Sequence, residues 1–188
     1  MPPAPALPQP VLPQHDPSFG LWSTPRIVAY RASLVQRIGL PEATLSVPRL
    51  SIVAPVFDGT DDITLNHGLG RIRGTAKFGE QGNVGIAGHR DSFLRALKDV
   101  VPGDSIEVTT PASRNVYVVD RIQIVDPSDV GVLAQGGGSR ITLVTCYPFY
   151  VIGPAPRRFV VQATLWQHVP QTDLRLTQQA HLEVQKEK

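Results

Sequence analysis

The amino-acid sequence predicts a mostly-β fold of one domain, a barrel or a sandwich with a few short helices. Glycine and proline are plentiful, at 16 and 18 of 188 residues, while aromatic residues make up only 6%. Such a composition suits short strands joined by turns better than a helical bundle. A series of short apolar runs separated by turn residues also favours strands. With apolar residues at 41%, a chain of this length can bury a core.

The beginning of the chain is rich in proline. Its first 13 residues, M-P-P-A-P-A-L-P-Q-P-V-L-P, favour extended polyproline II, so we expect a flexible leader over residues 1–23. A helix is predicted next, at about 25–38. Thr24 can cap it, Pro25 suits its first position and Gly39 can end it. Its apolar residues recur at helical spacing and are Ile27, Tyr30, Leu34 and Ile38.

Strands make up most of the remaining chain. They are expected at residues 45–56, 83–87, 105–109, 116–125, 140–146 and 159–169. Two helical turns are expected between them, at 92–98 and 128–134, each opening with a serine that can act as an N-cap. We predict that residues 24–169 form the domain. Residues 170–188 are then a C-terminal extension, either a surface helix or a frayed end.

Charge and composition exclude several functions. The formal net charge is only +2 and the basic residues are scattered, so the basic patch that nucleic-acid binding requires is missing. The single cysteine cannot form an internal disulfide bond. No apolar run approaches the roughly 18 residues of a membrane span, and no signal-peptide pattern begins the chain.

That cysteine, Cys146, ends the strand-like run T-L-V-T-C and is followed by Y-P-F. A thiol is a nucleophile mainly as thiolate, and its ordinary pKa near 8.5 leaves about a few per cent ionised at neutral pH. A catalytic cysteine therefore needs a basic partner. Taken alone, Cys146 is more ordinarily a small buried hydrophobic residue.

His89 is the candidate partner among the five histidines. It directly follows the small apolar run G-N-V-G-I-A-G, which places its imidazole at a strand end, and Gly88 leaves room for a close approach. His67, in L-N-H-G-L-G, is a competitor, although loop histidines beside glycine are usually turn-formers. The other three have contexts that favour solvated or structural roles, and they are His15, His168 and His181.

A positive charge is available from Arg157 and Arg158, at the entry to the last strand. Because alternate residues of a strand face opposite sides, one of the two should point toward the site. A guanidinium there could stabilise a thiolate, hold a substrate carbonyl or complement an oxyanion. The ordinary alternative is a pair of solvated charges at a sheet edge.

These three contexts together resemble the sortase family of cysteine transpeptidases, and class D in particular. The segment T-L-V-T-C over 142–146 matches the family's T-L-x-T-C signature, and residues 82–91 match its histidine motif G-N-x-x-I-A-G-H-R-D. The arginine motif A-P-x-R-F matches residues 155–159, which selects Arg158 rather than Arg157. The resemblance runs from about Pro41 to Leu165.

The resemblance implies a closed eight-stranded β-barrel with Cys146, His89 and Arg158 as catalytic residues at one end. It also implies a reaction. Cys146 attacks a threonine carbonyl in an L-P-x-T-G-like sorting signal of a surface protein, and an amine acceptor on the cell wall or another protein resolves the thioester. His89 would act as acid and base, Arg158 would hold the substrate backbone, and Thr145 would contact the substrate or orient Arg158. No cofactor is implied.

The resemblance also implies action at the extracytoplasmic face of a bacterial membrane, through an N-terminal anchor. No such segment occurs in these residues, so we expect the leader to be the remainder of an anchor that was removed; a naturally soluble form is the alternative. Arg71 stands where many class D members have a histidine. Three acidic residues could suggest a calcium site, although a solvated acidic turn is the more ordinary interpretation, and they are Asp58, Asp61 and Asp62.

Two other functions are compatible with these residues. A cysteine peptidase would form the same thioester and release it to water, so that no added amine appears in the product. A barrel that keeps the motif only as a binding or scaffolding module would have an unreactive Cys146.

Overall fold

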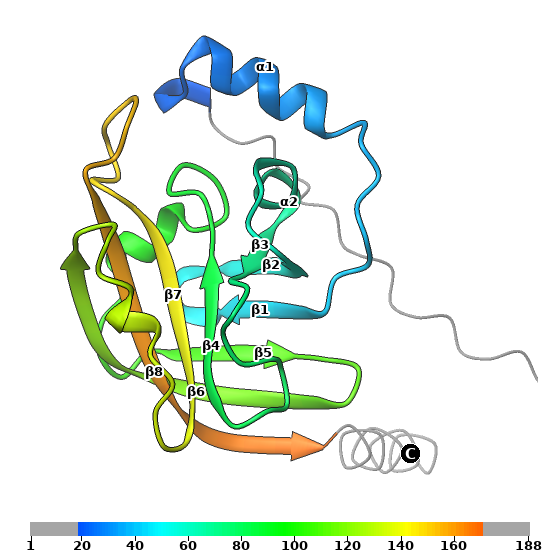
Figure 1. The fold of residues 1–188 in the computed structure, drawn as a ribbon, viewed down its shortest axis with the longest axis vertical. Coiled ribbons are helices and arrows are strands. Elements are labelled where there is room, and N and C mark those ends of the chain that lie inside the picture. Colours follow the sequence, from blue (N-terminus) through cyan, green and yellow to red (C-terminus); the bar gives the residue numbers. More distant parts are fainter. Residues whose placement is uncertain (1–18, 171–188) are drawn as a thin grey trace, which may run out of the picture.

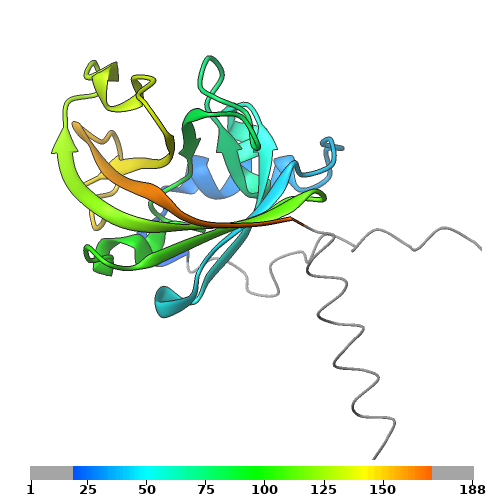
Figure 2. The same ribbon diagram turned by 90° about the horizontal axis from the view of Figure 1, so that it is seen from below.

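A computed structural model describes residues 19–170, which form a closed eight-stranded barrel with short helices around it (Figure 1). The predicted mostly-β barrel is confirmed. The strands are β1 (Ala43–Val47), β2 (Ile52–Asp58), β3 (Leu69–Arg71), β4 (Gly82–Ala87), β5 (Ser105–Thr109), β6 (Ser113–Val125), β7 (Ser139–Tyr147) and β8 (Arg157–Pro170). Around the barrel they follow the order β1-β2-β3-β4-β7-β8-β6-β5. The long strands β6 and β8 pair along one side of it (Figure 2).

The helices are short and lie outside the sheet. The two α-helices are α1 (Thr24–Ser33) and α2 (Asp62–His67), and the 3-10 helices are η1 (Phe19–Leu21), η2 (Pro48–Leu50), η3 (Arg95–Asp99) and η4 (Val130–Leu133). The predicted helical turns therefore form as η3 and η4, each over a slightly different range. Within residues 19–170, no helix is long and apolar enough to cross a membrane.

The core fills the inside of the barrel, because alternate residues of each strand face inward. In β7, Ile141 and Leu143 are fully buried and Thr145 continues their row, whereas Val144 and Cys146 are only half-buried. Burying each large aliphatic side chain contributes roughly 1.5 to 3 kcal/mol. The same alternation that builds the core therefore leaves Cys146 on the outer face of β7.

The first predicted strand, 45–56, is in fact a hairpin of two strands. The chain turns through η2, which begins with Pro48, and Ser51 adopts a left-handed backbone with φ of 54°. Proline cannot donate to the sheet, so a strand that runs through it is interrupted there. The hairpin brings β2 back against β1, with Val47 opposite Ile52.

Two elements were absent from the prediction. Strand β3 has only three residues, one of them glycine, so it lacks a recognisable apolar pattern. Helix α2 begins after Asp61, whose carboxylate accepts hydrogen bonds from the backbone N–H of Thr64 at 3.0 Å and from its hydroxyl at 2.8 Å. This arrangement is typical of helix N-termini, so Asp61 belongs to a helix cap rather than to a solvated acidic turn.

The N-terminal helix is confirmed, but it ends at Ser33 rather than at residue 38. Beyond it Val35 is exposed, so continuing the helix would gain no packing. Before it, η1 and Trp22 are part of the fold: the rings of Phe19, Trp22 and Tyr30 pack edge to face with centroids 5.2 to 6.0 Å apart. Residues 19–23, which the sequence assigns to the flexible leader, are therefore part of the folded structure. Residues 1–18 and the extension from 171 lie outside the described residues.

Candidate active site

Strand β7 lies between β4 and β8, and it carries the cysteine. It runs antiparallel to β8, and Cys146 is directly opposite Arg158 while Tyr147 is opposite Arg157. Directly opposed residues in an antiparallel pair place their side chains on the same face, about 4.5 to 5.5 Å apart at Cβ. Arg158 therefore shares the outer face of Cys146, and Arg157 shares the face of Tyr147.

The histidine reaches the same face from the other neighbouring strand. Strands β4 and β7 are parallel, with Ala87 opposite Val144, and the pairing continues with a hydrogen bond of 3.2 Å from the Gly88 N–H to the Val144 carbonyl. Advancing two residues on each chain from Ala87 and Val144 brings His89 beside Cys146, on the same side of the sheet. Strands β7 and β8 thus carry the cysteine and the arginine, and the segment that directly follows β4 carries the histidine toward the same face.

Thr145 and Gly88 fix the end of β4 against β7. Thr145 is buried on the inner face, and its hydroxyl donates a hydrogen bond of 2.7 Å to the Gly88 carbonyl. Gly88 has no room for a side chain, because an added Cβ would lie 2.6 Å from Leu69 Cδ2 and 2.8 Å from Leu94 Cδ1. The glycine before His89 is therefore required by the core.

His89 is held in an environment that favours its neutral form. Burial lowers the pKa of its imidazole, and the positive charge of Arg26 lowers it further, while Asp91 and Asp62 act in the opposite direction. Its Nε2 atom is buried and has no hydrogen-bond partner within the described part of the chain. This nitrogen is thus not committed to another group of the described residues.

The N-terminal segment lies across this end of the barrel (Figure 1). The indole N–H of Trp22 donates a hydrogen bond of 3.1 Å to the carbonyl of Asp91, two residues after His89. Arg26 stacks on Trp22 with 4.1 Å between guanidinium and ring centroid, donates to Asn66 in α2, and lies 3.7 Å from the Asp91 carboxylate. These contacts tie η1 and α1 to the segment that carries the histidine.

Arg158 is half-buried and has no acidic partner in the described residues. It donates to the carbonyls of Ala155 at 3.2 Å and Arg157 at 3.0 Å. Arg157 is more exposed and lies 3.9 Å from the carboxylate of Asp126. Of the two arginines, Arg158 is therefore the one that lies on the same face as Cys146 and whose charge no carboxylate of the described residues neutralises.

The competing histidines have other positions. His67 forms a hydrogen bond of 2.9 Å between Nδ1 and the Ile63 carbonyl of its own helix. His168 lies near the far end of β8, where its Nδ1 is 2.6 Å from the Asn115 side chain. Neither is on the strand ends that meet at Cys146. His15 and His181 lie outside the described residues.

Two of the three acidic residues that could suggest a calcium site have protein partners. Asp58 accepts a hydrogen bond of 2.5 Å from Arg71 and lies 3.8 Å from Arg73, while Asp61 caps α2. In residues 19–170 no group of three or more acidic, histidine or cysteine side chains is placed to hold a metal ion. Arg71 itself is buried, and its ion pairs connect β3 to Asp58 and Glu42.

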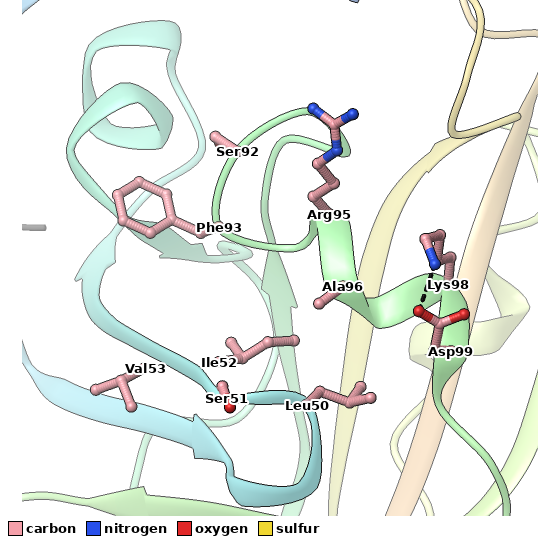
Figure 3. A pocket seen from close by; sticks show the side chains of 10 residues that line it. All are labelled: Leu50, Ser51, Ile52, Val53, Ser92, Phe93, Arg95, Ala96, Lys98 and Asp99. Atoms are coloured by element: carbon pink, nitrogen blue, oxygen red, sulfur yellow. Dashed lines mark hydrogen bonds and ion pairs between the residues drawn. The ribbon is translucent and has the colours of Figure 1, made fainter. Parts of the chain in front are cut away.

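A pocket of about 460 Å³ lies beside the site rather than in it. It is lined by residues 50–53, at η2 and the start of β2, and by residues from 92–99 (Figure 3). Its floor is apolar, and Arg95 points away from Leu50 and Ile52 (Figure 3). It includes none of the three site residues, so it is not where the thiol would meet a substrate.

Sequence reasoning missed two residues that shape the site. Arg90 directly follows His89 in the recognised motif, but the motif alone gives no reason for a buried guanidinium. Arg26 is an ordinary polar residue of an amphipathic helix, and it reaches Asp91 only because the folded chain brings α1 across the barrel. The residues around Arg26 and Arg90 in the sequence therefore do not indicate that either side chain contributes to the site.

Comparisons with known proteins identify the family to which this fold belongs. The family model described as a sortase domain matches residues 45–166. Sortase D of Bacillus subtilis is 28% identical over 132 residues, which cover 70% of this chain and 67% of the relative. The crystal structure of sortase E1 from Streptomyces coelicolor with a tripeptide in the active site has a TM-score of 0.65 and 28% identity, covering 74% of this chain and 96% of that one. Sortase A of Listeria monocytogenes has a TM-score of 0.64 and 26% identity, covering 70% and 91%.

Proposed function

Since this chain belongs to the sortase family, it is a cysteine transpeptidase, and we propose that Cys146, His89 and Arg158 are its catalytic residues. The observation that supports this assignment is the direct pairing of Cys146 with Arg158 across β7 and β8, together with the β4–β7 register that leads to His89. We further propose class D membership, on the motifs around these residues, and a catalytic domain over residues 24–169.

In the first half-reaction the Cys146 thiolate attacks the carbonyl carbon of a threonine in the sorting signal. A carbon–sulfur bond forms, and the carbonyl oxygen becomes an oxyanion that the Arg158 guanidinium can stabilise. His89, as imidazolium, donates its proton to the departing amine nitrogen as the carbon–nitrogen bond breaks. The C-terminal piece leaves, and the remainder is held as a thioester.

In the second half-reaction an amine attacks the thioester carbonyl. Neutral His89 accepts the proton that this amine loses, a new amide bond forms, and Cys146 leaves as thiolate. The active pair is thus thiolate and imidazolium. Because burial and Arg26 lower the pKa of His89, the imidazolium is the minor form at neutral pH, and we expect slow turnover with peptides.

Thr145 fits a different task from the substrate contact expected of it. Its hydroxyl faces inward and binds the Gly88 carbonyl, on the opposite side of β7 from the Cys146 thiol. We propose that Thr145 is a positioning residue, which holds the backbone immediately before His89.

Sortases act at the cell surface on proteins that carry sorting signals, and they transfer them to amine acceptors. For this chain we propose an L-P-x-T-G-like signal and an acceptor on the cell wall or another protein. We also propose that it works at the extracytoplasmic face of a bacterial membrane, held by an N-terminal anchor. The tripeptide in the active site of the related sortase E1 supports a peptide as the ligand.

Intact-protein mass spectrometry tests the proposal directly. The purified chain is mixed with a panel of L-P-x-T-G-type peptides, with and without glycine or a diaminopimelate-like amine. We expect an acyl adduct on Cys146 that the amine converts into a linked product, and none with Cys146→Ala. Product without the added amine would favour the hydrolytic peptidase. Failure of Cys146 to react with either peptides or thiol reagents would favour the scaffold.

A further inference from the structure

Arg90, the residue after His89, is a buried arginine that holds a loop by its backbone. Its side chain donates three hydrogen bonds: Nη1 to the Pro148 carbonyl at 2.8 Å, and Nη2 to the carbonyls of Val151 and Gly153 at 2.6 and 2.7 Å. Arg90 is only 8% exposed, and in the described residues no carboxylate pairs with it. A buried charge is costly unless hydrogen bonds satisfy it, so these three bonds account for its presence there.

The loop that Arg90 holds joins the two strands that carry the thiol and the guanidinium. It runs from Pro148 to Pro156, directly after Cys146 and Tyr147 and directly before Arg157 and Arg158. Any displacement of this loop therefore acts on the wall of the site between Cys146 and Arg158.

Other contacts hold the loop only in part. Phe149 is buried against the core, with its ring 5.2 Å from that of Phe159. The next three residues, Tyr150, Val151 and Ile152, are exposed, so burial of their side chains does not fix the loop. Apart from the bond that Arg158 donates to the Ala155 carbonyl, the side-chain hydrogen bonds to the loop backbone in the described residues come from Arg90.

We propose that Arg90 is a positioning residue of the transpeptidase: it fixes the β7–β8 loop relative to His89, so that the exposed side chains of residues 150–152 form a preset wall of the peptide site. This inference rests on the proposed function for its substrate. An arginine is required because its planar fork of donors reaches several acceptors at once, whereas a lysine offers one nitrogen.

The experiment compares Arg90→Met and Arg90→Lys with wild type. Arg71→Met is the matched control, because Arg71 is the other buried arginine of the described residues and binds Glu42 and Asp58 instead of the loop. Three quantities are measured: hydrogen exchange of the amides of residues 149–153, kcat/KM with a peptide that wild type cleaves, and the rate at which iodoacetamide alkylates Cys146 as a function of pH.

We expect Arg90→Met to speed exchange in the loop and to lower kcat/KM by about tenfold to a hundredfold, as displaced site walls do. The pH profile of alkylation should stay as in wild type, because Arg90 touches neither the thiol nor the imidazole. Arg90→Lys should have loop exchange and kcat/KM between those of wild type and Arg90→Met. It is the variant to measure if Arg90→Met does not fold. Arg71→Met should lower stability but leave loop exchange and kcat/KM near wild type.

Several results would overturn the proposal. Unchanged kcat/KM in both Arg90 variants would remove the positioning role, and an equal loss in Arg71→Met would reduce it to general stability. An altered alkylation profile would show that Arg90 acts on the thiol and histidine themselves. If wild type processes no peptide, the proposed function fails separately, and loop exchange still decides whether Arg90 anchors the loop.

Discussion

Cys146 and Arg158 are direct partners across the antiparallel pair of β7 and β8. Their spacing is therefore set by the sheet rather than by a flexible loop, and sites built on strands hold their geometry closely. The position of His89 depends in addition on the hydrogen bonds that continue the β4–β7 pairing through Gly88 and Thr145. From this arrangement we draw four predictions.

Replacing Arg158 by alanine should lower kcat/KM by roughly 10² to 10³, the loss typical when one oxyanion donor is removed. Arg157→Ala is the matched control, because it removes the same charge from the opposite face of the same strand end. The exposed contact of Arg157 with Asp126 contributes little, so we expect kcat/KM of Arg157→Ala to fall by less than about threefold. Steady-state peptide cleavage measures both. A larger loss in Arg157→Ala than in Arg158→Ala would reverse the assignment.

Replacing Arg26 by glutamine should raise the pKa of His89, because a positive charge that disfavours the imidazolium is removed. Titration of the His89 ring signals by NMR measures the change. Arg31→Gln is the control: it is on the same helix, but its guanidinium lies over the ring of Phe19. An unchanged or lower pKa in Arg26→Gln would show that α1 does not act on the histidine through charge.

Burial of neutral His89 should make the folded state sensitive to acid. Its pKa is lowered from 6.5 on folding. As the pH falls from about 6.5 toward the lower folded-state pKa, the unfolded chain binds more protons than the folded one, so the free energy of unfolding falls across this window. Urea unfolding of wild type and His89→Gln between about pH 7.5 and about pH 5 isolates this contribution. The loss of stability should be smaller in His89→Gln, and equal slopes would mean that His89 protonates freely in the fold.

Thr145→Val keeps the shape of the side chain but leaves the Gly88 carbonyl without its partner. We expect a loss of about 1 to 3 kcal/mol in the free energy of unfolding, as for other buried groups left unpaired. Peptide turnover should fall as well, since His89 follows Gly88 directly. Thr145→Ser restores the hydroxyl and should recover most of both. Full activity in the valine variant would leave Thr145 with a purely structural role.

The sequence correctly predicted the strands that are long and rich in β-branched residues, while the catalytic roles that its motifs assign to the cysteine, the histidine and the arginine stay a prediction. It failed where the signal is weak or non-local. Strand β3 is too short to show a pattern, and the hairpin at Ser51 depends on a left-handed residue that is not glycine. The early end of α1 reflects missing packing rather than propensity, since no part of residues 19–170 covers the exposed Val35.

The contacts that complete the site were beyond sequence reasoning because they join distant parts of the chain. Trp22 and Asp91 are 69 residues apart, and Arg90 and Pro148 are 58 apart. Nothing near Arg90 in the sequence distinguishes a buried arginine with three carbonyl partners from an exposed one. Such pairs become visible only when the topology places β4 beside β7.

The three acceptors of Arg90 are main-chain oxygens, which every residue type carries. These hydrogen bonds therefore do not depend on which side chains stand at residues 150–152, and we expect substitutions there to leave the bonds from Arg90 intact. Under the role proposed for this loop, substitutions at residues 150–152 would change which peptide is recognised without changing Cys146, His89 or Arg158. For protein engineering, a library restricted to these three positions samples new recognition at small risk to folding.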